Sequence, residues 1–194
     1  MNHAVSRKGA LREEALLRRG ALGPEIREMF SSRLAAQGLA IAQRVGPRVA
    51  SAFLPIKDEP DTLPLLAALA NGGFHTALPI TVSRAAPLTF RLWRPGDPTR
   101  PGALNIPEPL ASAEIVDPDL LFVPLACFDR RGHRIGYGAG HYDRSLEALR
   151  AKGPVTAVGV AYSASQAPGI PDEPHDQRLD FILTERELID CGKS

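Results

Sequence analysis

The feature that most restricts how this chain can fold is the segment 120–143, where an apolar strand, three alternating glycines and a helix start follow one another. Gly136, Gly138 and Gly140 allow backbone N–H groups to converge on an anion, and the N-terminus of the following helix adds its positive dipole end. Arg134 supplies a fixed positive charge beside them. Because ligands of open α/β sheets bind outside the carboxyl ends of the strands, the segment predicts an α/β fold with an anion site at that edge.

The spacing of the glycines separates this loop from two familiar phosphate-binding motifs. A dinucleotide-binding fingerprint counted from Gly136 needs a glycine where His141 stands, and the Gly-Lys-Ser/Thr triplet of a P-loop does not occur. Asp143 follows in the first helical turn and would repel a phosphate unless a cation lay between them. Mg²⁺ takes one or two carboxylates together with phosphate oxygens, so Asp143 is a candidate ligand. The alternative is a glycine turn followed by an ordinary helix-start aspartate.

Helices and strands alternate along the rest of the chain. Apolar spacing and capping residues predict helices over residues 6–20, 24–45, 62–71 and 141–152, and strands over 48–54, 74–78, 88–93, 120–123, 156–161 and 181–183. This alternation is typical of an α/β layered domain with a largely parallel sheet. The stretch 94–118 holds six prolines, and we interpret it as a long, ordered loop with a functional role.

The composition excludes several classes of protein. The 194 residues carry 23 lysines and arginines against 22 aspartates and glutamates, which argues against nucleic acid as the main partner because phosphate backbones require a basic surplus. Two cysteines are too few for a disulfide framework, and Cys127 is expected to be a small buried hydrophobe. No apolar stretch is long enough to span a membrane, and charges interrupt the N-terminal segment. We therefore expect a single domain over residues 1–194, located in the cytoplasm.

Four ordered fragments at compatible spacing carry a resemblance to a known family. They are Lys8-Gly-Ala-Leu-Arg12, Leu54-Pro-Ile-Lys-Asp-Glu-Pro-Asp-Thr62 centred on Glu59, Phe128-Asp129 followed by the run from Arg134 to Asp143, and Pro171-Asp-Glu-Pro-His-Asp176 with Thr184-Glu185. With these fragments the chain resembles the 5-formyltetrahydrofolate cyclo-ligases, also called methenyltetrahydrofolate synthetases, over nearly its whole length. Where that family often has Gly-Gly-Tyr-Tyr-Asp, this chain has Ala139 and His141.

The resemblance implies a fold and a reaction. The fold would be a single-domain, Rossmann-like open sheet, largely parallel and flanked by helices, of the CoA-transferase-like type. The reaction would convert 5-formyltetrahydrofolate and ATP, with Mg²⁺, to 5,10-methenyltetrahydrofolate, ADP and phosphate. The formyl oxygen would attack the γ-phosphate and N10 the activated carbon, so the substrate supplies both nucleophiles and the protein positions them. We expect a monomer that binds this small-molecule substrate, with no nucleic-acid or membrane partner.

The resemblance also assigns roles to residues of this chain. Nucleotide binding would fall to Lys8, Arg12, Arg134, Ile135, Gly136, Tyr137, Gly138, Ala139, Gly140, His141 and Tyr142, with Arg134 and Tyr142 catalytic. The folate would contact Leu54, Glu59, Tyr137 and His141, with the glutamate accepting hydrogen bonds from pterin N–H groups. Asp143 and Asp176 would hold Mg²⁺, and His175 would be a neighbour because Mg²⁺ favours oxygen ligands.

Each of these residues also has a plainer interpretation. Lys8 and Arg12, four residues apart on one helix face, are more commonly a solvated basic face. Glu59 beside a proline is commonly a surface acid. Tyr137 and Tyr142 beside the glycines are as often structural as functional. The family match favours the functional interpretation in each case.

Two other functions stay open at this point. A sugar-phosphate isomerase or transferase on a related fold would need a glutamate base or nucleophile over a sugar site and would not need ATP. A nucleotide-binding or folate-storing protein without turnover is the second alternative. The presence of Lys8, Arg12, Asp143 and Asp176 together argues against such a loss of activity.

Overall fold

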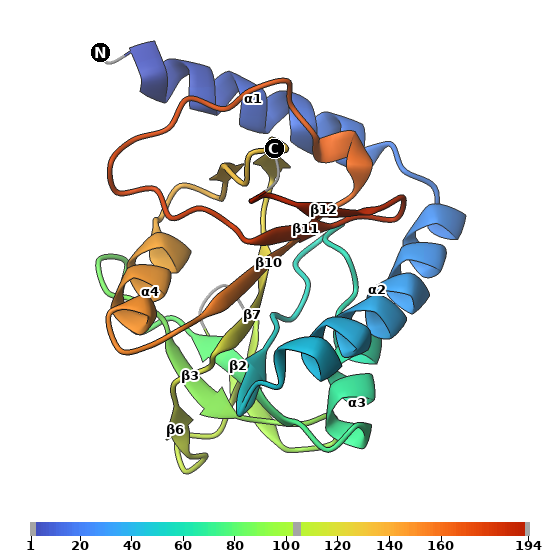
Figure 1. The fold of residues 1–194 in the computed structure, drawn as a ribbon, viewed down its shortest axis with the longest axis vertical. Helices are drawn as coiled ribbons and strands as arrows, with labels where there is room; N and C mark the ends of the chain where they lie inside the picture. Colours follow the sequence, from blue (N-terminus) through green and yellow to red (C-terminus); the bar gives the residue numbers. More distant parts are fainter. Residues whose placement is uncertain (1–2, 103–105, 193–194) are drawn as a thin grey trace.

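The computed structural model describes residues 3–102 and 106–192 and is built around an eight-stranded sheet (Figure 1). The strands follow one another across it in the order β12-β11-β10-β7-β1-β2-β3-β6. Their bounds are Val49–Ser51 for β1, His75–Ile80 for β2, Thr89–Leu92 for β3, Ile115–Val116 for β6, Leu120–Pro124 for β7, Thr156–Val160 for β10, Phe181–Leu183 for β11 and Leu188–Asp190 for β12. The strands from β11 to β2 are parallel, and β12, β3 and β6 pair antiparallel at the edges.

Strand β7 shows why this sheet needs helices on both faces. Its first four residues are all apolar and all buried. Successive side chains of a strand point to opposite faces, and accordingly Leu120 and Phe122 pack in one core cluster while Leu121 and Val123 pack in another. A central parallel strand of this kind is stable only when apolar helix faces cover both sides.

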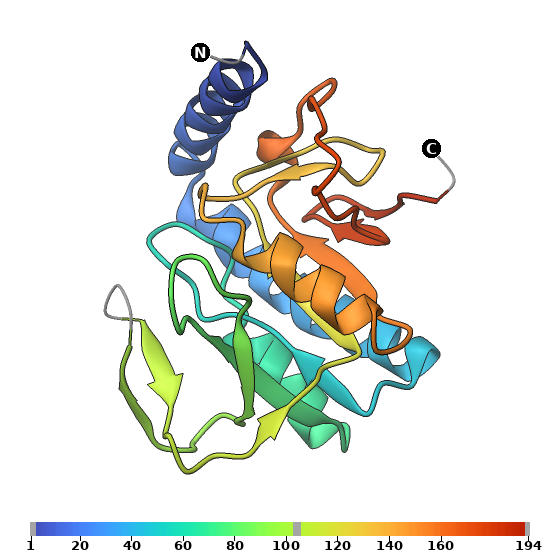
Figure 2. The ribbon, with the colours of Figure 1, turned by 90° about the vertical axis from the view of Figure 1, so that its left-hand side faces the viewer.

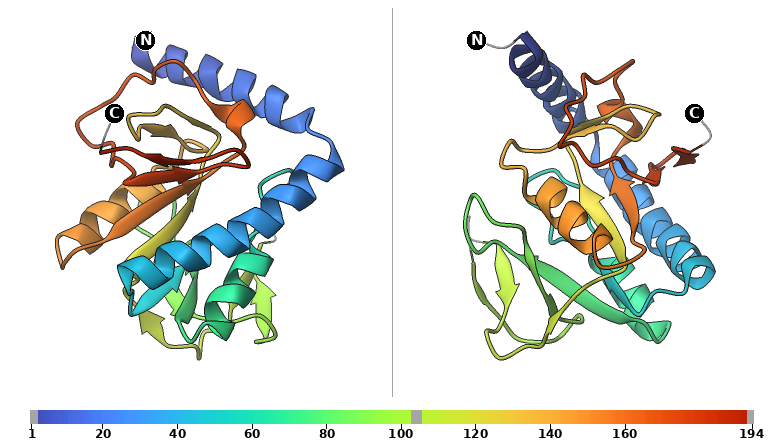
Figure 3. Two further views of the ribbon diagram at one scale, coloured as in Figure 1. Left: turned by 45° about the vertical axis from the view of Figure 1, so that its right-hand side comes forward. Right: turned by 60° about the vertical axis from the view of Figure 1, so that its left-hand side comes forward.

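Helices cover the two faces unequally (Figure 3). Helices α2 (Pro24–Val45) and α3 (Leu63–Asn71) pack on one face, and α4 (His141–Arg150) packs on the other. Helix α1 (His3–Gly20) instead crosses the end of the sheet, where it contacts strand β8 (Cys127–Phe128) and the 3-10 helix η2 (Ser163–Ser165). Because these two elements follow the carboxyl ends of β7 and β10, α1 brings its side chains to that edge.

Most of this architecture agrees with the sequence-based expectations. The α/β class and the largely parallel sheet are confirmed, and the helix predicted over residues 24–45 coincides with α2. The strand predicted over residues 181–183 coincides with β11, and the other predicted helices and strands match observed elements with shifts at their ends. Cys127 is fully buried, as expected. No helix in the described ranges is both long and apolar enough to cross a membrane.

The interpretation of residues 94–118 as a loop is wrong. Strands β4 (Thr99–Pro101) and β5 (Pro107–Pro109) pair antiparallel in a separate ribbon, which lies at the end of the molecule away from α1 (Figure 2), and β6 joins the edge of the main sheet. Residues 103–105 of the predicted loop lie outside the described residues. Proline is tolerated in edge strands, where its missing N–H is not needed, so the proline content disguised these strands. The sequence analysis also missed β8, β9 (Arg134–Ile135) and β12.

Gly38 marks the closest approach of α2 to its neighbours. A β-carbon built there would lie 2.3 Å from Leu65 Cδ1 of α3 and 3.2 Å from Phe122 Cζ of β7. Both of those side chains are buried, so neither can move into solvent to make room.

We predict that Gly38→Val lowers the free energy of unfolding relative to Gly9→Val by about 1–3 kcal/mol, the usual cost of overpacking a core. Gly9 in α1 is the matched control, because among the described residues no heavy atom beyond its chain neighbours and its own helix backbone lies within 4 Å of a β-carbon built there. Both substitutions change helix propensity equally, so their difference isolates the packing. Urea denaturation of the two variants measures it, and equal midpoints would contradict the packing described here.

Candidate active site

A short hairpin connects the carboxyl end of β7 to the glycine loop. Its strands, β8 and β9, pair antiparallel, and their turn is held by Asp129, which is 1% exposed. Asp129 accepts hydrogen bonds from the Arg131 N–H (3.0 Å) and the Ile170 N–H (3.0 Å). Burial alone would raise the pKa of Asp129, but the Ile170 N–H, the Arg131 guanidinium and the His133 N–H hold it below its ordinary value. Arg134 lies in β9 of this hairpin, so the contacts of Asp129 fix the position of Arg134 at the start of the glycine loop.

Arg134, which is buried, forms an ion pair with the partly exposed Asp143. The Arg134 side chain is 4% exposed, and its Nη2 lies 2.8 Å from Asp143 Oδ1. The same carboxylate oxygen accepts the Gln177 N–H at 3.0 Å, and Arg134 Nη1 donates to the Gln177 carbonyl oxygen. Asp143 lies in the first turn of α4, as predicted. These contacts join β9, the start of α4 and the segment around residue 177.

Lys8 reaches the same region from α1. Its Nζ lies 2.6 Å from Asp176 Oδ2 and 2.8 Å from Glu173 Oε2, and its side chain is only 14% exposed. Burial would lower the pKa of Lys8, but the two carboxylates raise it above its ordinary value. The interpretation of Lys8 as part of a solvated basic face is therefore wrong.

Arg12 lies across the glycine loop, one helical turn after Lys8. Its Nε donates to the Gly136 carbonyl oxygen at 2.9 Å. Gly138 has φ +95°, a conformation that residues with a β-carbon rarely adopt, and a β-carbon there would lie 3.7 Å from Arg12 Nη2. Gly140, at φ +67°, directly precedes α4. The loop predicted from the glycine spacing is thus present beside an arginine.

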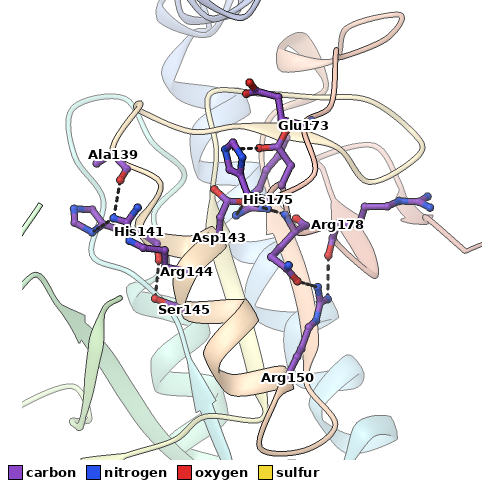
Figure 4. A network of polar contacts seen from close by, with 12 residues as sticks. Ala139, His141, Asp143, Arg144, Ser145, Arg150, Glu173, His175 and Arg178 are labelled. Carbon is purple, nitrogen blue, oxygen red and sulfur yellow. Dashed lines mark hydrogen bonds and ion pairs between the residues drawn. The ribbon is translucent and has the colours of Figure 1, made fainter. Parts of the chain in front are cut away.

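Hydrogen bonds tie the start of α4 to the preceding glycine loop (Figure 4) and to the loop between β2 and β3. His141 Nδ1 lies 3.1 Å from the Ala86 carbonyl oxygen, and Arg144 Nη2 donates to the carbonyl oxygens of Ala139 (2.7 Å) and Arg84 (2.8 Å). The Ser145 hydroxyl donates to the His141 carbonyl oxygen at 2.7 Å. The histidine that departs from the usual family motif therefore helps to anchor this end of the loop.

Glu59 is a buried acid with one unpartnered oxygen. It is 7% exposed, its Oε2 accepts the Ile56 N–H at 2.9 Å, and its Oε1 is buried without a hydrogen bond among the described residues. Burial raises the pKa of Glu59, and the Tyr137 hydroxyl and the Ile56 N–H offset this in part. The surface-acid interpretation is wrong. Leu54, predicted beside the folate, is partly buried and packs against the core.

The two tyrosines of the loop differ in their surroundings. Tyr137 is 49% exposed, and its hydroxyl accepts a hydrogen bond from Arg19 Nη1 at 2.8 Å. Tyr142 packs against the core cluster on the α4 face of the sheet, and burial raises its pKa. The position of Tyr137 beside Glu59 agrees with a ligand contact, and the catalytic role of Tyr142 stays a prediction.

Three groups near Lys8 could together hold a metal ion. Ligand atoms of Glu173, His175 and Asp176 lie within 4.8 Å of one another. Asp143, the other predicted ligand, is not part of this group, although its carboxylate bonds the N–H of Gln177, the residue after Asp176. Asp143 of α4 therefore contacts the segment that carries Asp176. Glu173, which the sequence analysis did not select, is a further candidate ligand in that segment.

Arg19 is a further residue that the sequence analysis missed. It lies on the same face of α1 as Lys8 and Arg12, because offsets of four and eleven residues both return to one side of a helix. Its Nε and Nη2 bind the two carboxylate oxygens of Asp58 at 3.1 and 3.0 Å. The helical spacing was the signal that could have found it.

The comparisons with known proteins agree with this geometry. The 5-formyltetrahydrofolate cyclo-ligase family model matches residues 4–185. A Mycolicibacterium smegmatis protein named 5-formyltetrahydrofolate cyclo-ligase is 32% identical over 94% of this chain and 95% of its own length, and an Escherichia coli protein of the same name is 30% identical over 88% and 96%. The solved structure of Aquifex aeolicus 5,10-methenyltetrahydrofolate synthetase superposes with a TM-score of 0.79 at 27% identity, covering 95% of this chain and 92% of that one.

The mixed α/β fold and the glycine loop at the carboxyl edge define a ligand-binding α/β enzyme. The match is specific enough to go further: the chain belongs to the 5-formyltetrahydrofolate cyclo-ligase family. The resemblance on which the sequence analysis relied is thereby confirmed.

We predict that Glu59→Gln raises stability while weakening folate binding. Because the folded-state pKa of Glu59 is raised, ionised Glu59 costs stability as the pH climbs above the ordinary value of 4.5, and the cost is complete once the pH exceeds the folded-state pKa. The variant lacks this cost, so its gain in melting temperature should grow as the pH rises above the ordinary value and vanish below it.

The matched control is Glu187→Gln. Glu187 is ion-paired with Arg130 at the surface, and Arg130 lowers its pKa. The same substitution there should give no gain in stability at high pH and should leave folate binding unchanged. A Glu59→Gln variant that is less stable at high pH, with folate affinity intact, would show that the residue is structural.

Proposed function

We propose that the chain catalyses the ATP- and Mg²⁺-dependent cyclisation of 5-formyltetrahydrofolate to 5,10-methenyltetrahydrofolate, with release of ADP and phosphate. The observation that carries the proposal is the buried, unpartnered Oε1 of Glu59 beside Tyr137 of the glycine loop. A buried acceptor without a donor is costly in a folded protein and is commonly satisfied by a ligand. Pterin N–H groups would supply the missing donors.

The glycine loop and α1 would bind the nucleotide. The N–H groups around Gly138 and the N-terminus of α4 attract phosphate oxygens. Arg12 already lies over the loop, and Lys8 lies further along the same helix face. These residues would hold the γ-phosphate next to the formyl oxygen, so that the protein contributes position and positive charge to phosphoryl transfer.

The acids around Asp176 suit Mg²⁺ in their chemistry. Carboxylate oxygens are the ligands that this ion prefers, and Asp176 and Glu173 lie together beside Lys8. We propose Asp176 and Asp143 as the carboxylates that hold it. When bound, Mg²⁺ would neutralise charge on the phosphates. In its absence Lys8 provides the countercharge for Asp176, whose pKa burial would raise and Lys8 holds below its ordinary value.

Folate chemistry needs no nucleophile from the protein. The formyl oxygen would form a bond to the γ-phosphorus as the bond to ADP breaks, and N10 would then attack the formyl carbon as phosphate leaves with that oxygen. Glu59 would fix the pterin, and Leu54, Tyr137 and His141 would contact the remainder of the folate. We propose Arg134 and Tyr142 as the residues nearest the reacting groups.

We also propose that residues 1–194 form one cyclo-ligase domain that acts as a monomer in the cytoplasm. One continuous sheet with core on both faces supports the single domain. The near balance of acidic and basic residues supports a small-molecule enzyme without a nucleic-acid partner.

We predict that turnover requires both ATP and Mg²⁺. Mixing the protein with 5-formyltetrahydrofolate and MgATP should produce the absorbance of methenyltetrahydrofolate, and leaving out the nucleotide or adding excess chelator should abolish it. Production at the full rate without nucleotide would refute the ligase assignment.

We predict that Asp176→Asn raises the Mg²⁺ concentration needed for half-maximal rate by at least about tenfold. Substituting a residue that only hydrogen-bonds to a metal ligand already lowers metal affinity by about tenfold or more, so loss of a direct ligand should cost at least as much. Its stability should change little, because Lys8 keeps Glu173 as a partner at 2.8 Å. Asp143→Asn is a poorer probe, because it would leave Arg134 buried without its counter-charge.

The control for this measurement is Glu173→Gln. This substitution also removes one negative charge that is paired with Lys8, and it leaves the other partner of Lys8, Asp176, in place. The Mg²⁺ requirement of this variant should rise less than that of Asp176→Asn. Equal requirements in both variants would contradict the assignment of the ion to Asp176 in preference to Glu173.

A further inference from the structure

Arg19 is a buried cation whose contacts connect two parts of the candidate site. Its side chain is 3% exposed, and all three guanidinium nitrogens are used. Nε and Nη2 bind the two oxygens of Asp58 at 3.1 and 3.0 Å, and Nη1 donates to the Tyr137 hydroxyl at 2.8 Å. Only the rigid fork of an arginine can make these contacts at once, since a lysine offers a single point charge.

One end of this connection is the loop that carries Glu59. Lys57 in this loop has φ +55°, an uncommon conformation for a residue with a side chain. The carbonyl oxygen of Asp58 accepts a hydrogen bond from Arg27 Nη1 at 2.9 Å, and Arg27 Nη2 donates to the Arg19 carbonyl oxygen at 3.1 Å. The two arginines therefore hold both the side chain and the backbone of the residue that precedes Glu59.

The other end of the connection is the glycine loop. Tyr137 lies between Gly136 and Gly138, and its ring centroid is 5.9 Å from the Arg19 guanidinium carbon, a cation–π distance. Arg12 holds the backbone of this loop through the Gly136 carbonyl oxygen. Two residues of α1 therefore hold the glycine loop: Arg19 holds the Tyr137 side chain, and Arg12 holds the loop backbone.

We propose that Arg19 is a positioning residue that couples the nucleotide loop to the Glu59 loop, so that each ligand binds more tightly when the other is present. The proposal rests on the proposed function. A nucleotide that orders the glycine loop orders Tyr137 and, through Arg19, the Asp58–Glu59 segment. Such coupling is reciprocal, because the free energy of forming the ternary complex is the same by either route.

The test is the ratio of 5-formyltetrahydrofolate dissociation constants without and with a non-hydrolysable ATP analogue and Mg²⁺, measured by calorimetry. The wild-type ratio should be about fivefold or larger, the lower end of typical couplings. Arg19→Lys should bring it to about one, because lysine cannot hold Asp58 and Tyr137 together. Arg18→Lys is the matched control and should keep the wild-type ratio, since Arg18 contacts Glu14 and backbone carbonyl oxygens near η2.

A second variant keeps the proposal testable if Arg19→Lys unfolds. Tyr137→Phe removes only a hydroxyl from a half-exposed side chain, so the fold should persist while the ratio falls. A wild-type ratio of one, or wild-type ratios in Arg19→Lys or Tyr137→Phe, would overturn the coupling role. A wild-type protein that binds neither ligand would instead overturn the proposed function itself.

Discussion

The ion pair between the buried Arg134 and the partly exposed Asp143 is the interaction on which the rest of the carboxyl edge depends. It closes the glycine loop at both ends, because Arg134 precedes the loop in β9 and Asp143 follows it in α4. Through Gln177 the same pair holds the segment that carries Asp176. Removing Asp143 would leave the buried Arg134 charge without compensation, which costs up to about 3–5 kcal/mol for a fully buried pair and less here because Asp143 is partly exposed. The ion pair therefore holds both ends of a loop whose glycines would otherwise leave its backbone free to adopt other conformations.

The other charges of this edge are arranged by the same rule, with one exception. Asp58 is bound by Arg19, Asp129 by Arg131, and Asp176 by Lys8. Each acid thus has a cation that offsets its loss of water. Glu59 is the exception, because it has no cation of its own: the Tyr137 hydroxyl lies beside it, and its Oε1 is buried without a hydrogen bond of normal geometry among the described residues. This buried oxygen is the reason why we propose that Glu59 receives a ligand with N–H groups.

The sequence was informative where local patterns decide the structure. Glycine spacing, the helix over residues 24–45 and the apolar run of β7 follow from neighbouring residues. Ion pairs were not predictable in this way, because Lys8 meets Asp176 across 168 residues of sequence. The burial of Glu59 and the role of Arg19 also depend on how α1 crosses the sheet, which no local pattern encodes. The prolines of β4 and β5 misled for the opposite reason: they signal a loop locally, whereas an edge position makes them acceptable in strands.

The central claim is that the glycine loop and Glu59 form one site in which nucleotide and folate meet. A crystal structure with a non-hydrolysable ATP analogue, Mg²⁺ and 5-formyltetrahydrofolate tests it most directly. The account predicts phosphate groups against residues 136–140 under Arg12, and the pterin hydrogen-bonded to Glu59 Oε1. A pterin bound elsewhere, with Glu59 Oε1 still unpartnered, would contradict it.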